Sequence, residues 1–185
     1  MLNINKCSME LINTSTKDLV LEWRNSERIR TMMLNQKLIE KEQHEQWFNS
    51  LFLNKNILVY IFKYNNEPMG VVTFTKLNYS GDVWEWGFYI GESEAPKGMG
   101  TLLGYTAIEL LFYELKKDKV VAEVLHYNLI SLSFHEKLGF QKEGILRKQV
   151  YCNSQYEDLH MFGLFEYEWR EKREKILSTL GAVGN

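Results

Sequence analysis

The sequence predicts an α/β (α+β) fold, a mixed sheet with helices on its faces. Three observations predict it. The middle of the chain has the continuously apolar and alternating runs of strands, the segments on either side have the period of amphipathic helices, and strand and helix patterns alternate from there to the end. The predicted order of elements is βααα-βββ-α-β-α-ββ-α.

The N-terminal part of the chain is predicted to form one strand and three helices. A short polar strand occupies residues 7–13, and Thr16 offers a cap to the first helix. The second and third helices are predicted over residues 26–33 and 41–53. Apolar and aromatic side chains share one side of the first and third helices. They are Leu19, Val20 and Trp23 in the first helix, and His44, Trp47, Phe48 and Leu51 in the third.

An antiparallel meander of three strands follows. Its first strand is a continuous apolar run rich in β-formers, residues 57–62 (ILVYIF), which is typical of a buried strand. A turn over residues 64–68 leads to the return strand, residues 69–75 (MGVVTFT). The third strand alternates around two tryptophans and covers residues 83–90 (VWEWGFYI).

Helices and strands alternate in the rest of the chain. A sharp break over residues 91–97 precedes a long helix with an apolar stripe of helical period, which ends near residue 116. The remaining elements are a strand (119–125), a short helix (131–138), two strands (141–148 and 156–165) and a charged helix from 166 to about 177.

Length and composition limit the class of protein. The 185 residues fit a single domain, 1–185, and 22 basic against 24 acidic side chains leave a net charge of −2. This balance gives no general reason to bind nucleic acid or an anionic membrane, and no apolar stretch is long enough to span a bilayer. Cys7 and Cys152 match neither a disulfide framework nor a metal spacing, and residues 1–11 have no apolar run or cleavage signature, so we expect no secretion. We therefore expect a cytoplasmic protein without a metal; a homodimer is left open.

A glycine turn joins the third meander strand to the long helix. It reads PKGMGT over residues 96–101, where Gly98 and Gly100 allow close approach of the backbone to a ligand. The following helix start offers unpaired N–H groups and the positive end of the helix dipole, so the turn either binds a phosphate or simply enters the helix. The Walker pattern is absent, and a dinucleotide fingerprint is disfavoured because its third glycine is Gly104 and the turn lies too far from the strand end. A coenzyme A site is the third interpretation.

The stretch from residue 83 to residue 140 resembles the GNAT superfamily of acetyl-CoA-dependent N-acetyltransferases. The resemblance rests on an ordered set of pieces. They are Gly87-Phe-Tyr-Ile at a strand end, Lys97-Gly-Met-Gly-Thr before a helix, Glu123 in the next strand, Asn128 and Ser131, and Phe134-His-Glu-Lys-Leu-Gly-Phe140. It implies the GNAT acyl-CoA N-acyltransferase fold, with a mostly antiparallel central sheet of about seven strands flanked by helices.

Flanking pieces extend the resemblance to nearly the whole chain. Trp23-Arg-Asn25, together with His44 and Trp47, is similar to the branch that contains ribosomal-protein acetyltransferases. Within that branch, WRN-S-x-x-I-R and SLSFHEKLGF-Q-x-EG-x-LR are most similar to the nucleotide-sugar N-acetyltransferases of pseudaminic acid synthesis.

The resemblance implies that acetyl-CoA binds between the strand ending at residue 90 and the strand ending near residue 125. The backbone of Phe88, Tyr89 and Ile90 would pair with the pantetheine amides, and an N–H group near Tyr89 would meet the oxyanion. The family usually opens the glycine turn with Gln or Arg where this chain has Ala95, so Lys97 would supply the positive charge. The other cofactor residues that the resemblance implies are Gly98, Met99, Gly100, Thr101, Asn128, Ser131, Phe134 and Lys137.

Transfer of acetyl to an amine requires a base, and protonation of the leaving thiolate requires an acid. Glu85 and Glu123 are carboxylates in apolar strands, where burial raises the pKa and suits proton abstraction, although either could instead face solvent. Many relatives place a tyrosine acid where this chain has His135. As an imidazolium His135 would be the stronger acid, and Tyr151 is an alternative. Neither cysteine lies in a nucleophile setting, so we expect direct transfer in a ternary complex.

The acceptor side is implied to be the three N-terminal helices. Arg24, Arg30, His44 and Trp47 could hold a nucleotide diphosphate sugar, with arginine on phosphate and tryptophan against base or sugar. Trp47 is equally typical of a core position. The resemblance implies acetylation of the 4-amino group of a UDP-linked deoxy-amino-sugar. The alternatives are acetylation of a protein N-terminus, as in the ribosomal branch, and a non-catalytic acyl-CoA-binding module.

Overall fold

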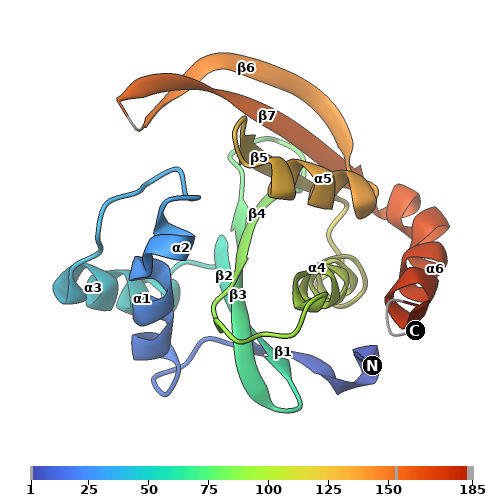
Figure 1. The fold of residues 1–185 in the computed structure, drawn as a ribbon, viewed down its shortest axis with the longest axis horizontal. Helices are drawn as coiled ribbons and strands as arrows, with labels where there is room; N and C mark the ends of the chain where they lie inside the picture. Colours follow the sequence, from blue (N-terminus) through green and yellow to red (C-terminus); the bar gives the residue numbers. More distant parts are fainter. Residues whose placement is uncertain (1, 153, 183–185) are drawn as a thin grey trace.

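A seven-stranded sheet organises the fold (Figure 1). Its strands are β1 (Cys7–Leu11), β2 (Ile57–Tyr64), β3 (Glu67–Lys76), β4 (Val83–Ile90), β5 (Lys119–Leu125), β6 (Gln141–Cys152) and β7 (Gln155–Phe165). The computed structural model describes residues 2–152 and 154–182, and places the strands in the order β1-β2-β3-β4-β5-β7-β6. Neighbouring strands are antiparallel except β4 and β5, which run parallel. The predicted mixed, mostly antiparallel sheet is therefore confirmed.

Six α-helices accompany the sheet in the described part of the chain. They are α1 (Lys17–Asn25), α2 (Glu27–Arg30), α3 (Lys41–Leu51), α4 (Met99–Glu109), α5 (Leu129–Lys137) and α6 (Glu166–Ala182). A 3-10 turn, η1 (Ile4–Lys6), precedes β1, and a π-helical turn, η2 (Leu110–Glu114), continues α4. None of these described helices is both long and apolar enough to cross a bilayer.

Helices cover both faces of the sheet. Figure 1 shows α1, α2 and α3 on one side of β2, β3 and β4, with α4 on the other side and α6 beside α4. Because successive side chains of a strand point to opposite faces, each central strand contributes to both layers. Trp84 and Trp86 pack in the core cluster that contains α4, whereas Ile61 and Val71 pack with Trp23 and the other buried residues of α1 and α3.

The parallel contact between β4 and β5 is short. Val83 to Glu85 pair with Lys119 to Val121, and beyond these pairs both strands continue without a mutual register in the described chain. Each strand is paired on its other edge, because Ile90 of β4 lies opposite Gly70 of β3 and Leu125 of β5 lies opposite Leu159 of β7. The two strand ends can therefore diverge while each stays anchored in its own part of the sheet.

Helix α1 packs directly on the end of β4. Gly91 is buried, and a Cβ built on it would lie 2.0 Å from the Trp23 ring, so only glycine fits there without a shift. Trp23 is itself 7% exposed. This contact fixes the distance between the helical layer and the strand that borders the divergence.

We expect Gly91→Ala to lower the free energy of unfolding by about 2 kcal/mol, because the added methyl group overpacks the indole contact. Chemical denaturation measures the effect. Gly81→Ala is the matched control, since the nearest atom to its built Cβ is Cγ2 of Val83 at 3.7 Å. The control should change stability by less than about 0.5 kcal/mol. Equal stability of both variants would contradict the packing of Trp23 on Gly91.

Candidate active site

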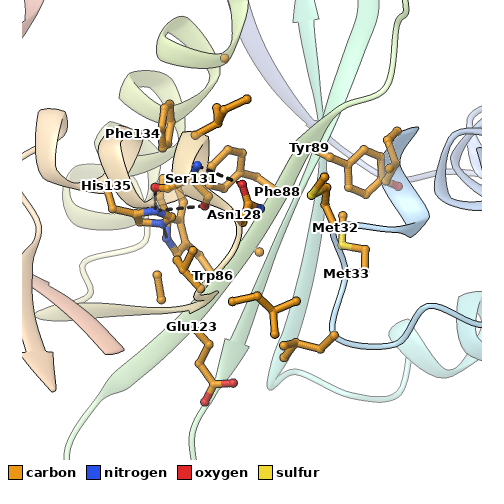
Figure 2. Close-up of a pocket in the computed structure, with 18 of the residues that line it drawn as sticks. Met32, Met33, Trp86, Phe88, Tyr89, Glu123, Asn128, Ser131, Phe134 and His135 are labelled. Atoms are coloured by element: carbon orange, nitrogen blue, oxygen red, sulfur yellow. Dashed lines mark hydrogen bonds between the residues drawn. The ribbon is translucent and has the colours of Figure 1, made fainter. Parts of the chain in front are cut away.

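The divergence of β4 and β5 opens a cavity of about 530 Å³. Figure 2 shows Tyr89, Met32 and Met33 on one side of β4, with Phe88 and His135 on the other. All five residues line the cavity. The cavity therefore crosses the sheet and reaches both helical layers, so two molecules approaching from opposite faces can meet in it.

Two carboxylates stand at this cavity. Glu85 lies opposite Val121, so Glu123, two residues further along β5, projects from the same face of the sheet. Both glutamates are partly buried and line the cavity. Burial raises the pKa of Glu85, and the charge of Glu123 raises it further; burial also raises the pKa of Glu123. Either group is therefore a better proton acceptor than an exposed glutamate.

The predicted cofactor residues divide into two groups. Those that line the cavity are Phe88, Tyr89, Ile90, Gly100, Asn128, Ser131 and Phe134. Those that lie outside its lining are Lys97, Gly98, Met99, Thr101 and Lys137. Lys97 and Lys137 are exposed, and Met99 is a core residue. The structure brings the strand end, the helix start and the α5 N-terminus to one cavity, with the two lysines at the surface.

Some N–H groups of the glycine turn are already bonded to carbonyls of the same turn. Gly98 has a φ of 95° and caps α4, and the N–H of Met99 donates to the carbonyl of Pro96 (3.1 Å). The N–H of Thr101 donates to the carbonyl of Gly98 (3.0 Å). Of the four turn residues that the resemblance implies as cofactor contacts (98–101), Met99 and Thr101 therefore have N–H groups that are already bonded, whereas those of Gly98 and Gly100 have no backbone partner among the described residues. The turn can offer a phosphate two main-chain donors.

Asn128 lines the cavity and also caps helix α5. Its Oδ1 accepts from the N–H of Ser131 (3.1 Å) and caps α5 (Figure 2). The carbonyl end of the side chain is thus committed to the helix, and the NH₂ end is the part that can contact a ligand.

His135 is buried at the wall of the cavity, with 2% exposure. Its Nδ1–H donates to the carbonyl of Ser131 (2.7 Å), and its Nε2 accepts from Nε1–H of Trp86 (3.2 Å; Figure 2). Burial lowers its pKa to about 4. The structure therefore does not support the imidazolium expected at this position, because both ring nitrogens are already bonded in the neutral form. The alternative acid, Tyr151, is exposed on β6 and lies outside the cavity lining.

A second pocket of about 350 Å³ lies between β3 and β4 and the helices α1 and α3. Arg24, His44 and Trp47, three of the four predicted acceptor residues, line it. His44 is buried and donates from Nε2 to the carbonyl of Lys17 (2.8 Å), and its ring lies 4.9 Å from that of Trp47. Arg30, the fourth, lines neither cavity. His44 therefore connects α3 to α1 in addition to facing the pocket.

The predicted acceptor arginines hold the backbone of the loop between α2 and α3. Arg24 donates from Nη2 to the carbonyl of Asn35 (2.6 Å), and Arg30 donates from Nη1 to that of Gln36 (2.7 Å). Asn25 exchanges hydrogen bonds with the main chain of Ile39, both of 2.9 Å. These bonds end α2 at residue 30, short of the predicted residue 33, because the chain turns to present its carbonyls to the arginines.

Sequence reasoning missed the residues that this loop and α2 contribute to the cavity. They are Arg28, Ile29, Met32, Met33, Leu34 and Asn35. No periodic pattern marks them, because the loop is positioned by side-chain bonds to its backbone. Arg28 also donates to the carbonyl of Gly91 (2.8 Å), which places its positive charge beside the end of β4.

Two guanidinium nitrogens are left without a partner among the described residues. Arg24 Nη1 and Arg30 Nε are buried and donate to no acceptor among the described residues. Burial lowers the pKa of Arg24. A buried, charged donor without an acceptor is unfavourable, so an anion or water that accepts from these nitrogens would relieve it.

Comparison with known proteins assigns a family to this arrangement. The acetyltransferase (GNAT) domain matches residues 10–141, a stretch that contains both diverging strands, the glycine turn and the two carboxylates. The chain therefore belongs to the GNAT acetyltransferase family. The sheet described above is the GNAT fold.

Curated relatives match part of the chain. The chain is 36% identical over 86 residues to YokL, an uncharacterized, SPbeta prophage-derived N-acetyltransferase of Bacillus subtilis (45% of this chain, 49% of the relative). It is 26% identical over 137 residues to the aminoglycoside N(6')-acetyltransferase type 1 of Klebsiella pneumoniae (68% of this chain, 64% of the relative). The chain thus spans less than two thirds of the length of these curated relatives.

A solved structure is similar over nearly the whole chain. It is spermidine N-acetyltransferase from Vibrio cholerae in complex with CoA and spermine, with a TM-score of 0.83 and 17% identity over 90% of this chain and 99% of that one. At this identity the likeness shows the fold.

We expect His135→Phe to reduce the acid sensitivity of the fold. The pKa of His135 falls from 6.5 to about 4 on folding, so the unfolded chain binds the proton first and stability is lost as pH falls through this window. Between pH 7 and pH 4 the wild type should lose about 3 kcal/mol more unfolding free energy than the variant. Denaturation at several pH values measures this difference.

Parallel stability curves for wild type and His135→Phe would contradict the prediction, because they would show that folding does not change the pKa of His135.

Proposed function

We propose that this protein is an acetyl-CoA-dependent N-acetyltransferase that acts on the 4-amino group of a UDP-linked deoxy-amino-sugar, as in pseudaminic acid synthesis. Transfer is direct and takes place in a ternary complex. The observation that carries the proposal is the cavity at the divergence of β4 and β5, because it joins a glycine-capped helix start, two carboxylates of raised pKa and the acceptor-side helices. Donor and acceptor can meet there without a covalent enzyme intermediate.

The features around β4 fit a coenzyme A ester. From Trp86 to Ile90 the β4 edge has no register with β5 in the described chain, so its backbone can pair with pantetheine amides. The N–H groups of Gly98 and Gly100, at the N-terminus of α4, can meet the pyrophosphate, and the exposed Lys97 adds charge. The NH₂ group of Asn128 can contact the arm from the other side of the cavity.

A carboxylate supplies the base in this proposal. The acceptor ammonium must lose a proton before nitrogen attacks the thioester carbonyl, and Glu85 or Glu123 takes that proton directly or through water. The tetrahedral oxyanion is met by a main-chain N–H near Tyr89 on the unpaired β4 edge.

The leaving thiolate takes its proton from solvent. His135 is neutral with both ring nitrogens bonded, so it has no proton to release without breaking its bond to Ser131. A thiol has a pKa near 8.5, so its thiolate is a tolerable leaving group at neutral pH. His135 instead positions Trp86 and the start of α5.

The acceptor assignment is supported by the arginines of α1 and α2. Arg24 and Arg28 line the cavity, and Arg24 keeps a buried nitrogen free of protein partners in the described chain. A diphosphate is a strong acceptor for such donors. The resemblance of the WRN-S-x-x-I-R stretch to nucleotide-sugar acetyltransferases favours the same acceptor. The single domain over 1–185, the cytoplasmic location and the absence of a metal stay predictions.

A panel of amines tests the function. The protein is incubated with acetyl-CoA and, in parallel, a UDP-linked 4-amino-4,6-dideoxy sugar, N-terminal peptides of ribosomal proteins, and spermidine. We expect thiol release and a mass gain of one acetyl group with the sugar nucleotide. Acetylated peptide instead would favour the ribosomal-type alternative. Binding of coenzyme A without thiol release for any amine would favour a non-catalytic module.

Glu85→Gln and Glu123→Gln, made separately, identify the base. The base works ionised, so activity falls as pH drops through its pKa, and this acid limb should lie above the ordinary value of 4.5 because burial raises the pKa of both groups. The variant that lacks the base should lose about 100-fold in kcat together with the acid limb.

The exposed Glu94 lies outside the cavity lining, and Glu94→Gln should behave as wild type. An unchanged pH profile in both cavity variants would remove the two carboxylates from proton transfer.

A further inference from the structure

We propose that Gly87 and the 350 Å³ pocket form a subsite for a neutral, weakly polar part of the acceptor, such as a methyl-bearing ring face, and that this subsite discriminates against polyamines. The inference rests on the proposed acetyltransferase function and specifies the acceptor class of the same site. It follows from an open space in the middle of β4 and from the charges around it.

Gly87 leaves a gap in a strand where a side chain is expected. It lies opposite Thr73 of β3, and a Cβ built on it meets no heavy atom within 4 Å. A glycine inside a strand weakens it, and often marks a place where a ligand approaches the backbone. No positive φ or close neighbour in the described chain requires glycine at this position. The open space itself is therefore the feature that a side chain would remove.

The gap joins the two cavities. Gly87 lines both of them, as do Arg24, Met33, Phe88 and Tyr89. By strand alternation Gly87 projects to the same face as Glu85, the face that α1 and α3 cover. Gly87 therefore lies where the cavity that holds the carboxylates meets the second pocket.

The second pocket has no carboxylate among its described lining residues that could pair with an ammonium group. Its walls are mostly apolar and aromatic, and Thr73 adds a hydroxyl. Among its described lining residues Arg24 is the only arginine or lysine, and none is aspartate or glutamate. A second ammonium group of a polyamine would lose its hydration there and face a guanidinium, which is unfavourable. A neutral ring face would lose little.

The spacing of the two features favours an amine carried on a ring. Glu85 and Gly87 are two residues apart on one face of a strand, which separates their positions by about 7 Å. One six-membered ring with a substituent spans this distance. Its amine can then stand near the carboxylate while the opposite edge enters the pocket over Gly87.

The test is Gly87→Val with Gly144→Val as its matched control. Gly144 is also a strand glycine whose built Cβ meets nothing within 4 Å, but it lies on β6, outside both cavities. With the UDP-linked 4-amino-4,6-dideoxy sugar as probe, Gly87→Val should raise the acceptor KM about tenfold or more. The acetyl-CoA KM should stay within about twofold, because the valine faces the acceptor side. Calorimetric titration of the sugar into the enzyme–coenzyme A complex should show the same loss for Gly87→Val only.

The wild type should also prefer the amino sugar to spermidine by about 100-fold in kcat/KM, because the second ammonium faces Arg24. Efficient spermidine acetylation would overturn the subsite and leave the acetyltransferase function standing. Equal effects of Gly87→Val and Gly144→Val, or a Gly87→Val effect on acetyl-CoA alone, would overturn it as well. Failure of the wild type to acetylate any amine is a different result, which removes the proposed function. If Gly87→Val does not fold, Gly87→Ala replaces it in the same measurement, and we expect a smaller rise in the acceptor KM.

Discussion

The limited contact between β4 and β5 is the constraint on which the rest of the structure depends. If the two strands paired to their ends, their backbone groups would satisfy each other and the cavity would close. They can diverge because β3 and β7 hold their outer edges along the full length. The divergence leaves main-chain donors and acceptors of β4 without a strand partner, which is unfavourable in a dry interior but suits a ligand that carries amides of its own.

Alternate side chains of β4 point to opposite faces of the sheet, so this one strand contributes to both sides of the cavity. Trp86 and Phe88 point to the side of α4 and α5, where Phe134 packs against both rings. Glu85 and Gly87 point to the side of α1 and α3. The two sides share the β4 backbone. Adjacent residues of this strand therefore face the two opposite sides of the sheet. Groups on both faces of the sheet are thereby held at one point by a single strand.

The periodic parts of the molecule were predictable and the aperiodic parts were not. The strand at residues 83–90 has the predicted bounds, because alternation and burial act within a single strand. Glu85 and Glu123 stood out as charges in apolar strands, and both reach the cavity. The sequence predicted a helix up to residue 33, whereas α2 ends at Arg30. The course of the loop that follows depends on bonds from Arg24 and Arg30, which no local pattern reveals. The environment of His135 also escaped prediction, since it depends on Trp86, far away in the chain.

Side chains of α1 and α2 hold the loop after Arg30 by its backbone. This affects which substitutions related sequences can tolerate in the loop. The anchoring bonds from Arg24 and Arg30 end on main-chain carbonyls, which every residue type possesses. Met32, Met33 and Leu34 supply only apolar side chains to the wall. Replacing them would reshape the recess while the scaffold beneath kept its path. Single substitutions at these three positions can thus change which acceptor fits, while Arg24 and Arg30 keep the loop backbone in place.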